Sequence, residues 1–407
     1  MLQALRNRTY RHLYLAQIVA LLGTGLATVA LGLLAYNLAG DAAGLVLGTA
    51  LAIKMVAYVL IAPLAAALVS HLSRKAVLIG ADALRLIVAL CLPFVGEVWQ
   101  VYLLIFILQA SSATFTPTFQ SVIPDVLPDE EEYTAALSLS RLAYDLESVL
   151  SPMLAAALLL IMDSATLFFG TAAGFAGSIL LVLSVLIPRR PSVDGGLDQA
   201  PFGQRLQRGM ALFIRQPALR PVIALNLVPA SAVAFVIVQT VVVVRSTFGL
   251  PEQVVAWVLG INGLGSMIAA IALPRVLRTI PERTVMLGGA ILLSAASALI
   301  PLALTAGHLT AGIAWVMALW LVIGLGWSAV ETPIGRIIRR NVDRHDLPTA
   351  FAAQFSLQHA CWLITYPLAG WLGSITLAGT AWVLAAIAAA ATITAAIIWP
   401  RSKTTTL

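Results

Sequence analysis

The feature of this sequence that most constrains its fold is a series of long apolar segments separated by short polar ones. A helix needs about 20 apolar residues to cross a bilayer, and twelve segments reach that length. With 60% hydrophobic and only 10% charged residues, the chain has too little charge to cover a soluble protein of 407 residues. The sequence therefore predicts an all-α membrane protein. The twelve predicted spans are 13–38, 44–69, 76–96, 99–121, 135–161, 165–187, 218–244, 253–274, 284–304, 311–331, 349–373 and 377–399.

The longest polar stretch, residues 188–210, separates six predicted spans from six. It is rich in glycine, proline and charged residues, which is typical of a linker between domains. The sequence therefore predicts two bundles and a connection between them. These are an N-terminal six-helix bundle (1–188), a cytoplasmic linker (189–216) and a C-terminal six-helix bundle (217–407).

The two halves also repeat a proline pattern. Pro117 lies 35 residues before Pro152, and Pro333 lies 34 residues before Pro367 at the corresponding place in the second half. An internal repeat of six spans is typical of transporters whose two halves move about a central binding site.

Basic residues predict the orientation in the membrane. All but four of the 24 Lys and Arg lie in segments that face one side if the spans alternate in direction. Because cytoplasmic loops carry an excess of Lys and Arg, we expect both termini in the cytoplasm and the chain in the cytoplasmic membrane. The net charge of +6 then reflects orientation, not nucleic-acid binding. The four exceptions are Lys54, Arg85, Arg141 and Arg245.

Two motifs point to a known family: "PLAAALVSHLSRKAVLIGADALR" (63–85) between spans 2 and 3, and "PTFQSVIPDVLP" (117–128) after span 4. On these motifs the chain resembles the major facilitator superfamily, and within it the macrolide-efflux-like and enterobactin-exporter-like branch. The resemblance covers nearly the whole chain. It implies a transporter that works by alternating access, with spans 1, 4, 7 and 10 lining the cavity.

The resemblance also implies a gating loop that closes the cytoplasmic side. Three residues depart from the family pattern there, since Ala66, Ser70 and His71 stand in place of its glycine, aspartate and arginine. The arginine after span 4 is replaced by Phe119, and the Gly-Pro of span 5 reads Ser151-Pro152. Four residues match the gating pattern: Arg74, Lys75, Asp82 and Arg85.

Charged residues inside predicted spans are the strongest functional signal, because a lysine at the centre of a bilayer costs about 2.5–3.5 kcal/mol on insertion scales. Lys54 lies in span 2, while Arg141, Asp145 and Glu147 lie in span 5. Arg141 and Asp145 are four residues apart and can pair on one helix face. Counted from the outer ends of their spans, Lys54 and Glu147 differ in depth by about 6 Å. We therefore expect Lys54 to be neutralised by Glu147 or, next, by Asp145; a purely structural ion pair or a snorkelling lysine is the alternative.

Polar residues at helical spacing predict a substrate cavity. In span 10, Trp320, Trp327 and Glu331 share a face, and aromatic rings beside a carboxylate suit an organic cation. An interfacial tryptophan belt is the alternative there. Ordinary hydrogen bonding between helices is the alternative for the other spans. The candidates in spans 1 and 4 are Gln17, Thr24, Thr28, Gln109, Ser112 and Thr116.

Signatures of an enzyme or of a bound cofactor are missing from the sequence: it contains no Walker loop, no metal-ligand spacing in a loop and no nucleotide-binding glycine run. We therefore expect no enzymatic activity, no cofactor and no resident metal. His359 and Cys361 in span 11, together with His71, leave open a divalent-metal exporter of the nickel type. Because the His and Cys are two residues apart on a helix, a packed polar helix is the favoured interpretation.

These observations favour a proton-coupled secondary transporter, monomeric, that exports a small amphipathic solute. The proton carrier would be Asp145 or Glu147, with Lys54 as the nearby cation. Besides metal export, a non-transporting membrane sensor or scaffold is the alternative, because the gating loop departs from the family pattern.

The orientation is directly testable with reporter fusions. Fusions after Pro188 and at the C-terminus should report a cytoplasmic location, because basic residues surround both sites. Fusions near Asp41, Asp163 and His308 should report an external location. Opposite signals at any two of these sites would contradict the twelve-span topology.

Overall fold

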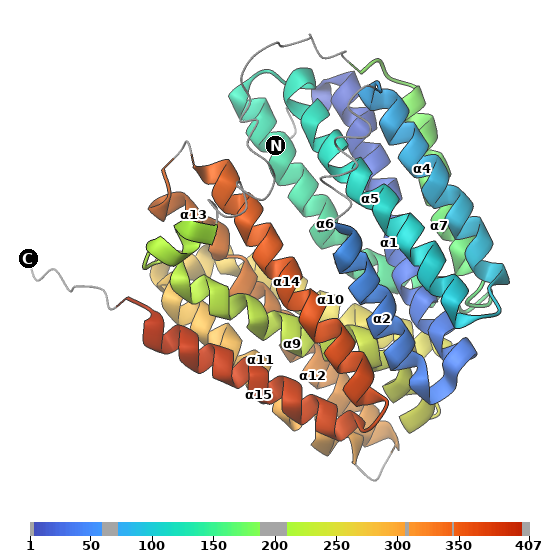
Figure 1. Cartoon of the computed structure of the whole chain (residues 1–407), viewed down its shortest axis with the longest axis vertical. Helices are drawn as coiled ribbons and strands as arrows, with labels where there is room; N and C mark the ends of the chain where they lie inside the picture. Colours follow the sequence, from blue (N-terminus) through green and yellow to red (C-terminus); the bar gives the residue numbers. More distant parts are fainter. Residues whose placement is uncertain (1–3, 59–71, 188–209, 306–308, 344–345, 401–407) are drawn as a thin grey trace, which may run out of the picture. The chain divides into compact units, whose positions relative to one another are not determined.

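A computed structural model describes residues 4–58, 72–187, 210–305, 309–343 and 346–400 (Figure 1). The described residues are helical, with short connections and no strand among them. The predicted gating residues Ser70 and His71 and most of the linker lie outside the described residues.

Twelve helices of 14 residues or more occur among the described residues, and each coincides with one predicted span. They end within six residues of the predicted limits, except that span 2 is described only to residue 58. The predicted all-α fold is therefore confirmed. The long helices are α1 (Arg8–Ala39), α2 (Ala43–Val56), α4 (Arg74–Cys91), α5 (Val98–Val126), α6 (Glu130–Leu158), α7 (Leu167–Leu183), α9 (Arg220–Val242), α10 (Glu252–Thr279), α11 (Glu282–Leu304), α12 (Leu309–Glu331), α14 (Leu347–Gly373) and α15 (Leu377–Ile398).

Eight helical stretches in the described parts of the chain are long and apolar enough to cross a membrane, and α7 is a shorter apolar helix. α6 differs in composition from the rest, since it carries Arg141, Asp145 and Glu147 within its length. A short amphipathic helix, α13 (Ile334–Asn341), follows α12 and buries its isoleucines while its arginines stay at the surface.

Local side-chain contacts fix where several helices begin. The Asn7 side chain accepts the Tyr10 amide at 3.1 Å at the start of α1, and the Ser73 hydroxyl accepts the Ala76 amide at 3.2 Å at the start of α4. Before α7, the amide and hydroxyl of Thr166 donate to Asp163, and these bonds hold the pKa of that carboxyl below its usual range.

The chain forms two compact units, one of residues 1–196 with 241–260 and one of residues 197–240 with 261–407. In the first unit, α1 packs against α7, α6 and α2, while α4 packs against α5 and α7 (Figure 1). In the second unit, α11 packs against α12 and α15.

Glycines allow the closest helix contacts within each unit. This is expected in a membrane, where the hydrophobic effect does not drive helices together and small residues permit close packing. In the first unit, a Cβ placed on Gly174 of α7 would lie 2.9 Å from the carbonyl oxygen of Val19 and 3.1 Å from the Cα of Gly23 on α1. In the second unit, a Cβ on Gly324 of α12 would lie 2.0 Å from the carbonyl oxygen of Asn262 on α10. These glycines set the distance between helix backbones.

The Gly324 contact gives a test of the second unit. Gly324→Ala should lower the Tm of the purified protein, because the new methyl group meets backbone and overpacking costs about 1–3 kcal/mol. Gly288→Ala on α11 is the matched control, since nothing lies within 4 Å of its added Cβ. That variant should unfold at the wild-type temperature or slightly above it, because alanine favours a helix by up to about 1 kcal/mol. Equal melting temperatures for the two variants would contradict the packing of α12 on α10.

Candidate functional site

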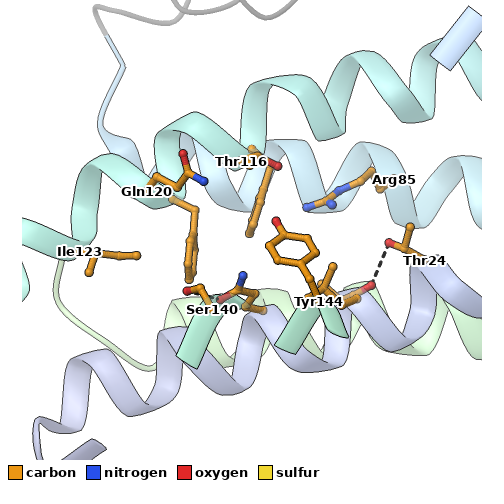
Figure 2. A pocket seen from close by; sticks show the side chains of 12 residues that line it. Thr24, Arg85, Thr116, Gln120, Ile123, Ser140 and Tyr144 are labelled. Atoms are coloured by element: carbon orange, nitrogen blue, oxygen red, sulfur yellow. Dashed lines mark hydrogen bonds between the residues drawn. The ribbon is translucent and has the colours of Figure 1, made fainter. Parts of the chain in front are cut away.

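A polar pocket lies inside the first unit, between α1, α4, α5 and α6 (Figure 2). It holds about 550 Å³ of empty space, its open mouth included. Polar groups line it from all four helices, and aromatic and aliphatic side chains complete the wall. The lining residues are Gln17, Ala20, Leu21, Thr24, Arg85, Phe115, Thr116, Phe119, Gln120, Ile123, Ser140 and Tyr144.

Hydrogen bonds orient several of the polar groups in the wall. The Ser140 hydroxyl donates to Oε1 of Gln17 at 3.1 Å, which ties α6 to α1. The Tyr144 hydroxyl is in hydrogen-bonding range of Gln17 and Thr116. The Thr24 hydroxyl instead donates to the carbonyl of Ala20, one turn earlier in α1, at 3.0 Å (Figure 2).

Arg85 reaches the pocket from α4, and its guanidinium is turned toward the Tyr144 hydroxyl (Figure 2). It is paired with Asp82, three residues earlier, and Asp82 also accepts the Ser178 hydroxyl of α7 at 2.6 Å. Asp82 is 0% exposed and Arg85 only 5%. The guanidinium carbon lies 4.3 Å from the ring centroid of Phe115 and 4.8 Å from that of Phe175. Burial of this charge is thus balanced by an ion pair, a hydrogen bond and two aromatic rings.

Asp82 and Arg85, two of the predicted gating residues, lie about two and three turns into α4, buried between helices. Arg74 and Lys75 do stand at the start of α4. Arg74 pairs with Asp125 of α5 at 2.5 Å, and Lys75 donates to the carbonyls at the end of α7, where the helix dipole favours a cation. Their role in gating stays a prediction.

The structure brings Lys54 of α2 and Glu147 of α6 together within the first unit. Each acts electrostatically on the other, and both side chains are half-buried. Gly25 of α1 makes room for Glu147 and for Ser151 of α6: an added Cβ would lie 2.1 Å from Oγ of Ser151 and 3.0 Å from Oε1 of Glu147. The side chains of Arg141 and Asp145 lie outside the described set, so Glu147 is the carboxylate seen beside Lys54.

The predicted cavity residues of spans 1 and 4 divide into two groups. Gln17, Thr24 and Thr116 line the pocket. The hydroxyls of Thr28 and Ser112 donate to the carbonyls of Thr24 and Leu108 in their own helices. Gln109 is buried, at 8% exposure, and is not among the lining residues of this pocket.

The three residues predicted to share one face of span 10, Trp320, Trp327 and Glu331, have different surroundings in the structure. Trp320 is a core residue at 0% exposure: its indole donates to Thr240 at 2.8 Å and its ring meets the edge of Phe235. Within the second unit it is therefore packing, because no part of the ring is open. Trp327 and Glu331 lie beside α14 instead, where Gln358 donates to Glu331 at 2.6 Å.

The sequence did not predict that residues of α14 would lie beside Trp327 and Glu331. Trp362 meets Trp327 edge-on at 6.3 Å between ring centroids, and Tyr366 lies 4.8 Å from Trp362. The i, i+4 spacing of Trp362 and Tyr366 was the signal that pointed to one face. Gln354, on the same helix, exchanges two hydrogen bonds with Asn226 of α9.

In the first unit, Ser140 and Tyr144 were not predicted as pocket residues. The signal was present, because Ser140, Tyr144 and Glu147 follow at i, i+4 and i+7 and so share one face of α6. No group of three or more His, Cys, Asp or Glu side chains that could hold a metal ion occurs in the described part of the chain. His359 packs on Phe355 with ring centroids 3.8 Å apart. His71, the third residue of the metal interpretation, lies outside the described residues.

An all-α bundle of long apolar helices with an internal polar pocket is the arrangement of a membrane solute transporter. Residues 13–306 match the family described as Major Facilitator Superfamily, and the chain belongs to this family of transporters. It is therefore a multi-pass membrane transporter and not an enzyme.

Individual relatives agree with this assignment. The chain is 23% identical over 296 residues to the uncharacterized MFS-type transporter YfiS of Bacillus subtilis (strain 168), a match that covers 70% of this chain and 67% of that protein. It is 27% identical over 169 residues to macrolide efflux protein A of Enterococcus faecalis, covering 40% of this chain and 51% of that protein. The match thus spans about half the length of that efflux protein. The resemblance to the macrolide-efflux-like branch is confirmed.

Solved structures give the same fold. The nucleoside transporter NupG superposes with a TM-score of 0.76 at 14% identity, covering 97% of this chain and 100% of that one. A bacterial homologue of the iron transporter ferroportin, in an inward-facing state, superposes with a TM-score of 0.73 at 14% identity, covering 97% and 99%. The twelve-helix fold of the family is thus confirmed.

The hydrogen bond from Ser178 to Asp82, which pairs with the pocket residue Arg85, gives a test of how the pocket wall is stabilised. Ser178→Ala should destabilise the protein by roughly 1–3 kcal/mol, because a fully buried carboxylate loses a hydrogen-bond donor. Ser184→Ala at the end of the same helix is the control, since that exposed hydroxyl donates only to the nearby carbonyl of Leu181 and its removal should be close to neutral. The measurement is thermal unfolding of the purified proteins in one detergent. An unfolding temperature for Ser178→Ala equal to that of the control would contradict the role of Ser178.

Proposed function

We propose that this chain is a secondary active transporter that exports a small amphipathic solute across the cell membrane in exchange for protons. Export is supported by the similarity to macrolide efflux protein A of two bacterial species. The amphipathic character of the solute is supported by the pocket wall, which sets polar groups beside phenylalanine, leucine and isoleucine side chains. The proposal includes a monomer with both termini in the cytoplasm, in which bundles 1–188 and 217–407, joined by the linker 189–216, alternate in access.

The observation that carries the proton coupling is the Lys54–Glu147 pair beside the pocket. Glu147 is a carboxylate within a helix that crosses the membrane, and a proton carrier in such a place needs a partner for its charged form. Lys54 provides that partner. When the carboxylate takes a proton, the pair loses its attraction and the two helices lose a tie, so protonation can bias the conformation.

Tyr144 connects this pair to the pocket. Its hydroxyl interacts electrostatically with both Glu147 and Arg85, and its side chain lines the pocket wall. A solute that displaces the Tyr144 hydroxyl therefore changes the field at Glu147. This is the physical route by which solute binding and proton binding are proposed to exclude each other.

Transport is tested with the purified protein in vesicles that contain a pH-sensitive dye. With an inward-directed solute gradient and no initial pH gradient, addition of a transported solute should drive proton movement in the opposite direction. The panel contains a macrolide, neutral carbonyl compounds, organic acids, organic amines and nickel ions. Proton movement with nickel alone would favour the metal exporter, and no movement with any compound would favour the sensor or scaffold.

The role of the charge pair is tested by a double-mutant cycle. Lys54→Met should lower the membrane abundance of the protein, because the Glu147 carboxyl left without its partner must take up a proton, which costs folding free energy at neutral pH. Glu147→Gln in the same protein should restore abundance, because no unpaired charge remains, yet exchange should stay uncoupled from protons. The coupling of the two sites is visible only in the full cycle.

Thr49→Val on α2 is the matched control, since the Thr49 hydroxyl only donates to the carbonyl of Leu45 in its own helix. It should transport like the wild-type protein. Transport by Lys54→Met with the wild-type pH profile would contradict a role of Lys54 in proton coupling. The lysine would then be merely tolerated in its helix.

A further inference from the structure

Arg85 has donor capacity that its partners do not use. A guanidinium carries five N–H donors in a rigid plane. One nitrogen, Nη2, is paired with Asp82. Nε is buried and has no hydrogen-bond partner among the side chains that the structure describes. Because a buried donor without an acceptor costs about 1–3 kcal/mol, an acceptor brought by a ligand would gain from this site.

The surroundings of Arg85 fix the direction from which that acceptor can come. The rings of Phe115 and Phe175 cover the guanidinium at 4.3 and 4.8 Å, and Asp82 occupies part of its edge. Tyr58, at the end of the described part of α2, also lies in electrostatic range of the guanidinium. Since the N–H donors lie in the plane, a ligand reaches them at the part of the edge that faces the pocket. There the hydroxyls of Thr116 and Tyr144 stand near the same space (Figure 2).

The charges around the pocket decide which acceptor fits. Asp82 already offsets the charge of Arg85, and Asp82 is itself held by Ser178. Lys54 and Glu147 offset each other, and Glu147 lies in electrostatic range of Tyr144. Among the side chains that the structure describes around the pocket, a carboxylate on the ligand would add a negative charge to a set of charges that already offset one another. An ammonium group would face the guanidinium. A neutral oxygen meets neither penalty.

We propose that this pocket binds its solute through a neutral carbonyl-type oxygen, such as that of an ester, lactone, ketone or amide, which accepts a hydrogen bond from Arg85. The apolar body of the solute packs on Leu21, Phe119 and Ile123. The proposal rests on the proposed transport function and names the chemical class of its substrate. It separates carbonyl compounds from organic acids and amines of the same size.

Three probes with one apolar body test the proposal: phenylbutyramide, phenylbutyrate and phenylbutylamine. Equilibrium binding to the purified full chain is measured by calorimetry in one detergent at neutral pH. The amide should bind tightest, with the acid and the amine each weaker by about tenfold, the ratio that corresponds to 1.4 kcal/mol. Equal or tighter binding of the acid would assign an anion site, tighter binding of the amine would assign a cation site at Glu147, and no binding of the amide would also overturn the proposal.

The role of Arg85 is tested by the double variant Asp82→Asn with Arg85→Gln, which removes both charges and so leaves no unpaired ion. It should bind the amide at least about tenfold more weakly, because a charge-assisted hydrogen bond is lost. Ser111→Ala on α5 is the matched control; this hydroxyl donates to the carbonyl of Ile107 at 2.8 Å and does not line the pocket, so binding should stay at the wild-type value. Unchanged amide binding by the double variant would overturn the proposal.

If the double variant does not fold, the ranking of the three probes on the wild-type chain still decides the matter. Equilibrium binding needs no proton gradient. Failure of the proton-exchange measurement therefore leaves the binding result standing, and failure of the binding ranking leaves proton exchange standing.

Discussion

Charge inside a bilayer is tolerated only where it is neutralised nearby, and the interior of the first unit follows from this constraint. Two couples of opposite charge lie there: Asp82 forms an ion pair with Arg85, and Lys54 lies in electrostatic range of Glu147. The first is held by Ser178 and two phenylalanine rings. In the second, both side chains are half-buried and Glu147 lies beside Gly25, and protonation of this one carboxylate would remove its attraction to Lys54.

Tyr144 connects the pocket to both couples. It contributes to the pocket wall, and its hydroxyl lies in electrostatic range of Arg85 and of Glu147. In a medium of low dielectric constant such interactions extend further than in water. This proximity allows binding energy at the pocket to reach the Lys54–Glu147 pair without a long chain of intermediate residues.

The sequence was sufficient for the helices, because lipid leaves the backbone few alternatives and an apolar run of span length must become a helix. Helix rise converts residue number into distance, and on that basis the sequence predicted similar depths for Lys54 and Glu147, which lie in electrostatic range of each other in the structure. It failed where tertiary contacts decide. Trp320 has the pattern of a cavity residue but is enclosed by Thr240 and Phe235.

The close approach of Gly324 to Asn262, and the aromatic neighbours that α14 adds to Trp327, likewise depend on which helices pack together. No periodicity within one helix specifies this. The residues that the sequence missed in the pocket, Ser140 and Tyr144, did share a helix face with Glu147. The intramembrane carboxylate was therefore the best single marker of the site.

We propose that Lys54 and Glu147 neutralise each other in the resting protein. The most direct measurement is infrared spectroscopy of the purified protein in lipid, with the Glu147→Gln difference spectrum used to assign the carboxyl band. The account predicts an ionised carboxylate band from Glu147 in the wild-type protein at neutral pH, and its replacement by the band of a protonated carboxyl when Lys54 is changed to Met. A Glu147 band that is the same with and without Lys54 would contradict the account.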